Sequence, residues 1–344
     1  MKNIFEKEKF NILLSELVNA INPVIEELSD SYVSEETQKI VRYQTSTGGK
    51  RIRSILAILS CRLLGGQTKD VLYPAAGLEL LHNYSLIVDD IIDNSNLRRG
   101  LPTTWSKFGK SIAQCIAIDY SAAVFQAANQ SSKPFIMSDL FAKTIKTIVD
   151  GEILDILFEQ AGRDEETYVL ENRYREISQK DYFRMISRKT ATLFQACCEA
   201  GAICAEAEQK EVDALKEFGF NLGMAFQIQD DILDIFGEEK TFGKKIGKDI
   251  EERKGGNIVI ILALKELNSN GRNGLLELIR KERTGRKEIT AAIKLIEKTK
   301  AREKACLAGK KFIERARKSL ETLPQNEWSD ILREIAEFII QREK

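Results

Sequence analysis

The chain has 344 residues, of which 43% are hydrophobic, a length that allows one large domain or two. Lysine plus arginine and aspartate plus glutamate number 52 each, so the net charge is zero and no overall field favours nucleic acid or an anionic membrane as a partner. The six cysteines contain no CxxC pair and His82 is the one histidine, which argues against a zinc site and a disulfide scaffold and favours reduced cysteines in the core.

The predicted elements, from the N-terminus onward, are helices. Apolar residues recur at spacings of three and four, as in Phe10, Leu13, Leu14 and Leu17, whereas strand-like alternation is nearly absent. We expect roughly ten or more helices in a single all-α domain over residues 1–344, because the breakers between them are too short to act as linkers. The N-terminal MKNIFEKEKF has no apolar signal segment, and no apolar run is long enough to span a bilayer. These features predict a soluble, cytoplasmic protein.

The first charged motif along the chain is GGKRIRS, residues 48–54, ahead of an apolar helix. Helix N-termini normally attract acidic residues, yet here Lys50, Arg51 and Arg53 accompany two glycines. Free backbone N–H groups, nearby cations and the close approach that glycine permits are features of an anion site. The alternative is a solvated basic turn.

Two acidic motifs, VDDIID and then QDDILD, lie within otherwise apolar helical segments. Asp89 and Asp93 are four residues apart and share a helix face, as do Asp230 and Asp234. Paired carboxylates repel each other, whereas Mg²⁺ prefers oxygen ligands and takes one or two carboxylates plus substrate phosphates. A solvated acidic face is the alternative, but the apolar flanks of both copies disfavour it. We therefore predict two acidic helices that face each other across a metal-bound diphosphate.

Further basic and polar side chains lie near these motifs in the sequence. Arg98 and Arg99 follow the first acidic motif, where they suit an oxygen anion but also an ordinary helix C-terminus. His82 lies two turns before Asp89 on the same face, so phosphate contact is plausible, although an isolated histidine is more often a core residue. The remaining candidates are Lys189 and Thr190 in mid-helix, and Lys244, Lys245, Lys248 and Lys254 after the second acidic motif.

Together these motifs predict two pockets for polyanions. One is bridged by metal between the acidic helices, and the other is metal-free and lined by Lys50, Arg53 and Arg99. An enzyme that acts on two diphosphate substrates would use both pockets.

Four segments, GGKRIR, DDIIDNSNLRRGLPT, RKTATLF and GMAFQIQDDILD, resemble in order and separation the motifs of the trans-isoprenyl diphosphate synthases, the polyprenyl synthetase family. The resemblance covers nearly the whole chain. It implies the isoprenoid synthase fold, in which antiparallel helices surround a deep central cavity, and a homodimer. It also implies that isopentenyl diphosphate is condensed with an allylic diphosphate to give an all-trans polyprenyl diphosphate.

The resemblance implies roles for individual residues. Asp89, Asp93 and Asp230, supported by Asp234, would bind Mg²⁺, roughly three ions per site when substrate is bound. The allylic diphosphate would be held by Arg98, Lys189, Lys244 and Lys254. Isopentenyl diphosphate would be held by Lys50, Arg53, His82 and Arg99. The forming carbocation would be lined by Thr190 and Gln227.

Product length is predicted from the residues that precede the first acidic motif. Tyr84 lies five residues before Asp89, roughly 7 Å along the helix axis, and Ser85 between them is small. A bulky fifth residue with a small fourth one resembles the geranylgeranyl (C20) pattern, so we predict a C20 product with Tyr84, Ser85 and Leu81 as the chain-length residues. If the Tyr84 side chain instead packs away from the growing product, as an ordinary core residue, the channel stays open and the product is longer.

The sequence also departs from the family pattern. Val88 and Trp105 stand where many relatives have histidine, and Gly256 and Ile258 stand where threonine and proline usually follow Lys254. These departures bear on the role of Lys254 and on the product class.

Several alternatives remain open at this stage. The chain could be a longer-chain polyprenyl diphosphate synthase, the catalytic subunit of a heteromeric one, or a degenerate regulatory subunit. A class I terpene cyclase also uses an aspartate-rich helix and magnesium, but its second metal motif typically mixes Asn or Asp with Ser or Thr and Glu, whereas this chain repeats DDxxD.

Overall fold

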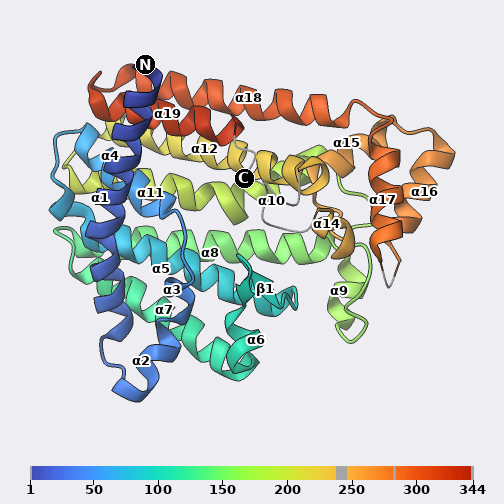
Figure 1. The fold of residues 1–344 in the computed structure, drawn as a ribbon, viewed down its shortest axis with the longest axis horizontal. Coiled ribbons are helices and arrows are strands. Elements are labelled where there is room, and N and C mark those ends of the chain that lie inside the picture. The colour runs from blue at the N-terminus through green and yellow to red at the C-terminus, as the bar shows by residue number, and fades with distance from the viewer. Residues whose placement is uncertain (1, 238–245, 282–283, 342–344) are drawn as a thin grey trace. The chain divides into compact units, whose positions relative to one another are not determined.

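Helices account for nearly all of the regular structure in the computed structural model, which describes residues 2–237, 246–281 and 284–341 (Figure 1). The helices of the N-terminal half are α1 (Lys2–Asp30), α2 (Glu35–Val41), α3 (Tyr43–Ser46), α4 (Ile52–Leu63), α5 (Thr68–Ile92), α6 (Thr104–Phe108), α7 (Lys110–Asn129), α8 (Pro134–Phe158) and α9 (Thr167–Asn172). Those of the C-terminal half are α10 (Gln179–Ile186), a π-helix (Ser187–Ala191), α11 (Thr192–Cys204), α12 (Gln209–Phe236), α14 (Lys248–Glu251), α15 (Ile258–Glu266), α16 (Ser269–Ile279), α17 (Arg286–Ile296), α18 (Ala301–Ser319), a 3₁₀ turn (Leu320–Thr322) and α19 (Glu327–Gln341).

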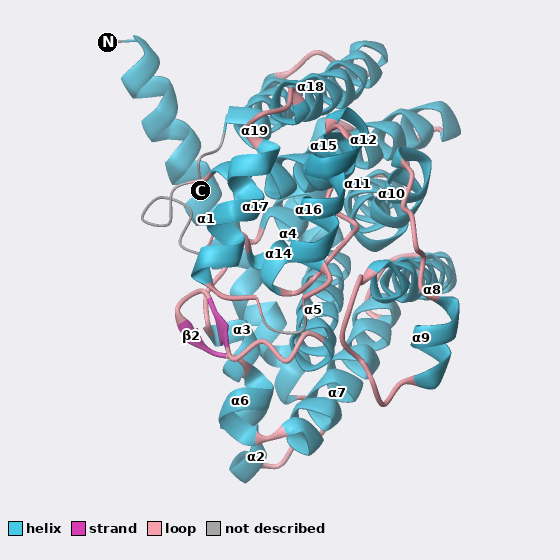
Figure 2. Ribbon diagram, turned by 90° about the vertical axis from the view of Figure 1, so that its right-hand side faces the viewer, coloured by secondary structure: helices cyan, strands magenta, loops and turns pink. Residues whose placement is uncertain are grey.

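The one sheet within the described residues is a two-stranded antiparallel hairpin, β1 (Leu97–Arg98) and β2 (Leu101–Pro102), drawn in magenta in Figure 2. Arg99 and Gly100 form its turn with positive φ angles of 55° and 77°. The expected all-α class is therefore confirmed.

The chain forms two compact units. The first comprises Met1–Ile145, Leu193–Gly219 and Arg317–Ile335, and the second comprises Lys146–Thr192, Phe220–Ala316 and Ala336–Lys344. The single domain expected over residues 1–344 stays a prediction, as does the central cavity.

The core of the first unit is built around α5, which packs against α1, α4 and α7. α5 begins after Gln67, whose backbone N–H donates to the Asp70 carboxylate at 2.8 Å. A Cβ at Gly77 would lie 2.8 Å from the Cβ of Ala127, so glycine lets α5 and α7 approach closely. This packing buries most of α5, whose C-terminal end contains the first acidic motif.

The core of the second unit contains α15, whose first six residues are buried. Asn257 caps this helix, because its side-chain oxygen accepts from the N–H groups of Val259 at 2.9 Å and Ile260 at 3.3 Å. α10 and the π-helix that follows it pack nearby, and a Cβ at Gly151 of α8 would collide with the backbone nitrogen of Lys189. Glycine thus permits the contact between α8 and the π-helix.

The six cysteines are free thiols. Cys61, Cys197, Cys198 and Cys204 are buried as expected, whereas Cys115 is exposed. Burial raises the pKa of Cys61, Cys198 and Cys204 to about 12. Within the described ranges, none of the helices combines the length and the apolar character that crossing a membrane requires.

Candidate active site

The first acidic motif lies at the C-terminal end of α5, in the first unit. Asp89 and Asp93 are half-buried, and the Asp93 N–H donates to the Asp89 carbonyl at 2.8 Å where the helix ends. A helix C-terminus carries partial negative charge, so carboxylates on one face there attract cations, and the charge of Arg98 already acts on both. The placement therefore fits the predicted magnesium ligands.

Asp90, between these two residues in the sequence, is 1% exposed and binds Arg98. Arg98 donates from Nε at 2.9 Å to one carboxylate oxygen and from Nη2 at 2.8 Å to the other. Burial lowers the pKa of Arg98, but the bonds to Asp90 and the charges of Asp90, Asp89 and Asp93 together outweigh burial and raise that pKa above its ordinary value. This bidentate pair fixes the orientation of the guanidinium group. Asp90 was not among the predicted site residues, and the substrate role of Arg98 stays a prediction.

Four arginines of the first unit lie close enough to His82 for their charges to act on it. Burial, and after it the charges of Arg53, Arg99, Arg98 and Arg51, hold the pKa of His82 well below its ordinary value, so the imidazole is neutral near pH 7. Burial also lowers the pKa of Arg53 and of Arg99. Concentrated, partly desolvated positive charge favours an anion. The structure thus brings together three of the four residues predicted to hold isopentenyl diphosphate.

The loop that contains the fourth residue, Lys50, contacts the hairpin turn. Arg99 Nη1 donates to the carbonyl of Gly48, and a Cβ at Gly49 would lie 3.0 Å from the same nitrogen. Gly48 and Gly49 have φ angles of 86° and 146°, which L side chains rarely adopt. The paired glycines therefore allow this loop to lie against Arg99, and Lys50 is exposed at its end.

Arg51 and Arg53 have different environments although they are two residues apart. Arg51 is buried and donates to the Glu79 carboxylate at 3.3 Å and to the Thr45 carbonyl at 2.8 Å, so it supports the loop. Arg53 lies over the Phe194 ring, 5.0 Å from its centroid, and its buried Nε has no hydrogen-bond partner within the described residues. A buried donor without a partner is unfavourable, so an anionic ligand near Arg53 would stabilise the site.

The second acidic motif lies near the end of α12, in the second unit. Asp230 is half-buried, whereas Asp231 and Asp234 are buried, and Asp234 accepts from the backbone N–H groups of Lys248 at 3.0 Å and Asp249 at 3.2 Å. Burial, followed by the charge of Asp249, raises the pKa of Asp231 to about 8 and that of Asp234 well above its ordinary value. A divalent cation bound here would stabilise the charged form of these carboxylates against both burial and the charge of Asp249.

The donor sets of both motifs fit magnesium by their chemistry, since they are carboxylates only. In the described part of the chain, no group of three or more His, Cys, Asp or Glu side chains is placed to hold a metal ion by itself. Magnesium usually keeps several waters and binds one or two carboxylates plus substrate phosphates, so it requires no such protein cage.

Two predicted carbocation residues contact each other in the second unit. Thr190 Oγ1, in the π-helix, donates to Gln227 Oε1 at 2.9 Å, and Gln227 Nε2 donates to the Asp231 carboxylate at 3.0 Å. The amide is thereby oriented with its oxygen toward Thr190. A polar chain thus connects the π-helix to the second acidic motif.

Two of the predicted diphosphate lysines also lie together in the second unit. Lys189 Nζ and Lys254 Nζ donate to the same Asp155 oxygen, at 2.7 Å and 3.3 Å. Lys244 lies outside the described residues, as does Lys245, whereas Lys248 is half-buried and pairs with Glu252.

The predicted chain-length residues lie on α5. Leu81 is fully buried, and Tyr84 and Ser85 are half-buried. Ser85 Oγ donates to the His82 carbonyl at 2.8 Å, so its small side chain is bonded back onto its own helix. The effect of these residues on product length stays a prediction.

Comparison with known proteins decides the family. The family model for polyprenyl synthetase matches residues 34–296. The chain belongs to the polyprenyl synthetase family. It is therefore a prenyltransferase, as the sequence predicted.

Relatives of this polyprenyl synthetase cover it almost completely. A geranylgeranyl diphosphate synthase from Sulfolobus acidocaldarius is 33% identical over 97% of this chain and 99% of that protein. Component 2 of the heptaprenyl diphosphate synthase from Geobacillus stearothermophilus is 31% identical over 97% of this chain and 99% of that protein. The crystal structure of a polyprenyl synthase from Caulobacter crescentus, complexed with calcium and isoprenyl diphosphate, superposes with a TM-score of 0.86 at 27% identity and covers 98% of each chain.

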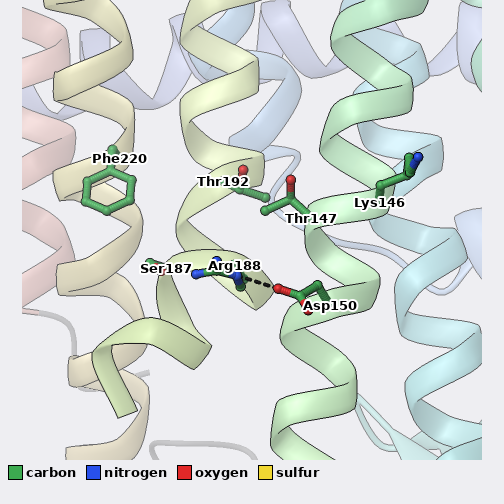
Figure 3. Close-up of a pocket in the computed structure, with 7 residues that line it drawn as sticks. All are labelled: Lys146, Thr147, Asp150, Ser187, Arg188, Thr192 and Phe220. Atoms are coloured by element: carbon green, nitrogen blue, oxygen red, sulfur yellow. Dashed lines mark hydrogen bonds and ion pairs between the residues drawn. The ribbon is translucent and has the colours of Figure 1, made fainter. Parts of the chain in front are cut away.

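A pocket of about 430 Å³ in the second unit of this polyprenyl synthetase is separate from the predicted residues (Figure 3). It is lined by Lys146, Thr147, Asp150, Ser187, Arg188, Thr192 and Phe220. Figure 3 shows the Asp150 carboxylate directed at Arg188, with which it forms an ion pair. None of the residues predicted to bind metal or substrate lines this pocket, so we do not assign it to the candidate active site.

Sequence reasoning missed the residues that hold the predicted ones in place. These are Asp90, Glu152, Asp155, Asp249 and Asn257. Asn257 is fully buried and donates to the Asp249 carboxylate at 2.8 Å. The sequence feature that could have indicated its capping role is its position directly before the apolar run of α15, which is typical of a helix N-cap. For Asp155, the signal was a carboxylate within an apolar stretch of α8, but its partners are 34 and 99 residues away in the sequence.

Proposed function

We propose that the chain makes geranylgeranyl diphosphate (C20) by condensing isopentenyl diphosphate with allylic diphosphates. The observation that supports the proposal is that cationic side chains and a pair of carboxylates both lie on or around one helix, α5. The charges of four arginines act on neutral His82, and two carboxylates suited to Mg²⁺ follow at Asp89 and Asp93. The C20 length is supported by Tyr84 and by the relative named as a geranylgeranyl diphosphate synthase.

Each group of residues has a role in this mechanism. Asp89 and Asp93 in the first unit, and Asp230 with Asp234 in the second, would hold Mg²⁺, roughly three ions in the substrate complex. When bound, these ions stabilise the negative charge that develops on the departing diphosphate. The allylic diphosphate accepts hydrogen bonds from Arg98, Lys189, Lys244 and Lys254. Isopentenyl diphosphate accepts hydrogen bonds from Lys50, Arg53, His82 and Arg99.

The carbon–carbon bond forms while both substrates are held in place. The site holds the isopentenyl double bond next to the allylic cation. The two groups therefore react within one complex and need not meet by chance in solution. The hydroxyl of Thr190 and the amide oxygen of Gln227 would stabilise that cation. The product loses a proton, for which the released diphosphate is the base.

The test is direct elongation. Purified protein with magnesium and labelled isopentenyl diphosphate is offered dimethylallyl, geranyl, farnesyl or geranylgeranyl diphosphate, and the products are sized after dephosphorylation. Elongation that stops at C20 supports the proposal. Longer products keep the reaction and refute the C20 length, and no incorporation from any primer refutes the proposal for the isolated chain.

We also propose that the protein is a homodimer. Four exposed residues without charge recur at helical spacing along α7: Ile112, Cys115, Ile118 and Phe125. An uncharged apolar face is suited to a two-fold copy of itself, since identical patches then cover each other. Sedimentation equilibrium tests this: the wild type should be dimeric and Ile118→Asp monomeric. A cytoplasmic location belongs to the same proposal, since buried free thiols suit a reducing compartment.

The alternative is the catalytic subunit of a heteromeric synthase that makes longer products. The relative named as component 2 of heptaprenyl diphosphate synthase favours it. It predicts that the chain alone incorporates no isopentenyl diphosphate and gains activity when a second subunit is added.

A further inference from the structure

Asp155, in α8, lies at the centre of a group of ion pairs in the second unit. Its side chain is 10% exposed. The Oδ2 atom accepts from Lys189 Nζ at 2.7 Å and lies 3.3 Å from Lys254 Nζ. Glu152, one turn earlier on α8, binds Lys189 Nζ at 2.7 Å, and Glu252 lies 3.8 Å from Lys254 Nζ.

Backbone contacts hold the two lysine-bearing segments against α8. Gly151 lets the π-helix that carries Lys189 pack directly on α8. The segment that carries Lys254 forms a β-bridge with Glu159 at the end of α8, and the Gly255 N–H donates to the Phe158 carbonyl at 3.2 Å. The backbone positions from which both lysines reach Asp155 are therefore set by the fold.

We infer that Asp155 is a positioning residue that holds Lys189 and Lys254 as a pair ready for the allylic diphosphate, an inference that rests on the proposed function. Since both nitrogens bond one oxygen atom, two groups that would otherwise repel each other are kept close together. A lysine loses rotamer freedom when a ligand immobilises it, and Asp155 imposes that restriction before the substrate arrives. Glu152 restrains Lys189 from a second side.

The carboxylates also affect which form of the diphosphate binds. Asp155, Glu152 and Glu252 partly neutralise the lysines, so this group attracts a bare diphosphate less strongly than two isolated lysines would. The binding of a diphosphate whose charge is balanced by magnesium depends less on this attraction, so the carboxylates weaken it less. The lysine pair therefore provides hydrogen bonds at defined positions more than net charge.

The test is Asp155→Asn, which keeps the shape of the side chain and removes its charge. The KM for the allylic diphosphate should rise, and kcat/KM for that substrate should fall by roughly 10- to 100-fold, because a small misplacement of binding groups has effects of that size. The KM for isopentenyl diphosphate should stay unchanged. In calorimetry with magnesium, the Kd of an unreactive allylic thiolodiphosphate should rise by a similar factor.

Asp150→Asn is the matched control (Figure 3). Asp150 also lies on α8 and also pairs with a cation of the π-helix, Arg188, which directly precedes Lys189. That pair is exposed, with 60% and 40% of the two side chains accessible, and exposed pairs contribute little. Both KM values and the analogue Kd should therefore match those of the wild type.

Several outcomes would overturn the inference. One is an unchanged allylic KM and analogue Kd in Asp155→Asn, and another is an equal loss for both substrates, which a purely structural role predicts. If Asp155→Asn does not fold, Asp155→Glu keeps the charge and displaces the oxygen by one methylene, and it should still weaken analogue binding selectively. If the wild type binds the analogue but forms no product, the proposed function fails while the binding comparison still decides the role of Asp155.

Discussion

Replacing Tyr84 by alanine tests the predicted limit on product length. Successive turns of α5 are about 5.4 Å apart, and the next residue on this face toward the N-terminus is Leu81, which is fully buried. An extended chain advances about 1.2 Å per bond, so the four chain bonds of one isoprene unit span about 5 Å. Removing the Tyr84 ring should therefore admit one further unit, and C25 should become the main product.

The assay compares wild type, Tyr84→Ala and Tyr84→Phe with farnesyl diphosphate as primer and labelled isopentenyl diphosphate in excess. Tyr84→Phe retains the ring and should stop at C20. An unchanged C20 product from an active Tyr84→Ala enzyme would refute the reasoning, because the ring would then not limit the growing chain. Lengthening in both variants would also contradict it, since the phenylalanine ring fills nearly the same space.

Three further predictions concern stability and metal. Glu79→Gln should lower the free energy of unfolding in urea by about 3 kcal/mol, because it leaves the Arg51 guanidinium buried without its counter-charge. A loss below about 1 kcal/mol would show that the ion pair contributes little to stability. Gly151→Ala should lower the free energy of unfolding by about 1–3 kcal/mol and also lower kcat/KM, since the new methyl group displaces the backbone of Lys189. An unchanged urea midpoint of unfolding would contradict this packing. Chelation of divalent cations should abolish incorporation of isopentenyl diphosphate, and magnesium should restore it; activity that persists in the chelator would exclude the metal role of the aspartates.

Local sequence pattern determined the fold class and the family. Apolar spacings of three and four depend only on the geometry of a single helix, so the helices could be predicted without knowledge of their neighbours. The same holds for Asp89 and Asp93, whose shared face follows from their spacing. The motif order then identified the polyprenyl synthetase family, which the family model confirms.

Tertiary structure alone decided which charged residues bind each other. Arg51 and Arg53 are nearly equivalent in the sequence, yet Arg51 forms an ion pair with Glu79. The buried Nε of Arg53, in contrast, has no hydrogen-bond partner in the described residues. Asp155 was overlooked because its two lysines are distant in sequence and become its partners only when the π-helix and the segment after α14 pack on α8. Spacing along one helix specifies which side chains share a face, but the partner of that face depends on which helices pack together, and packing is a property of the whole core.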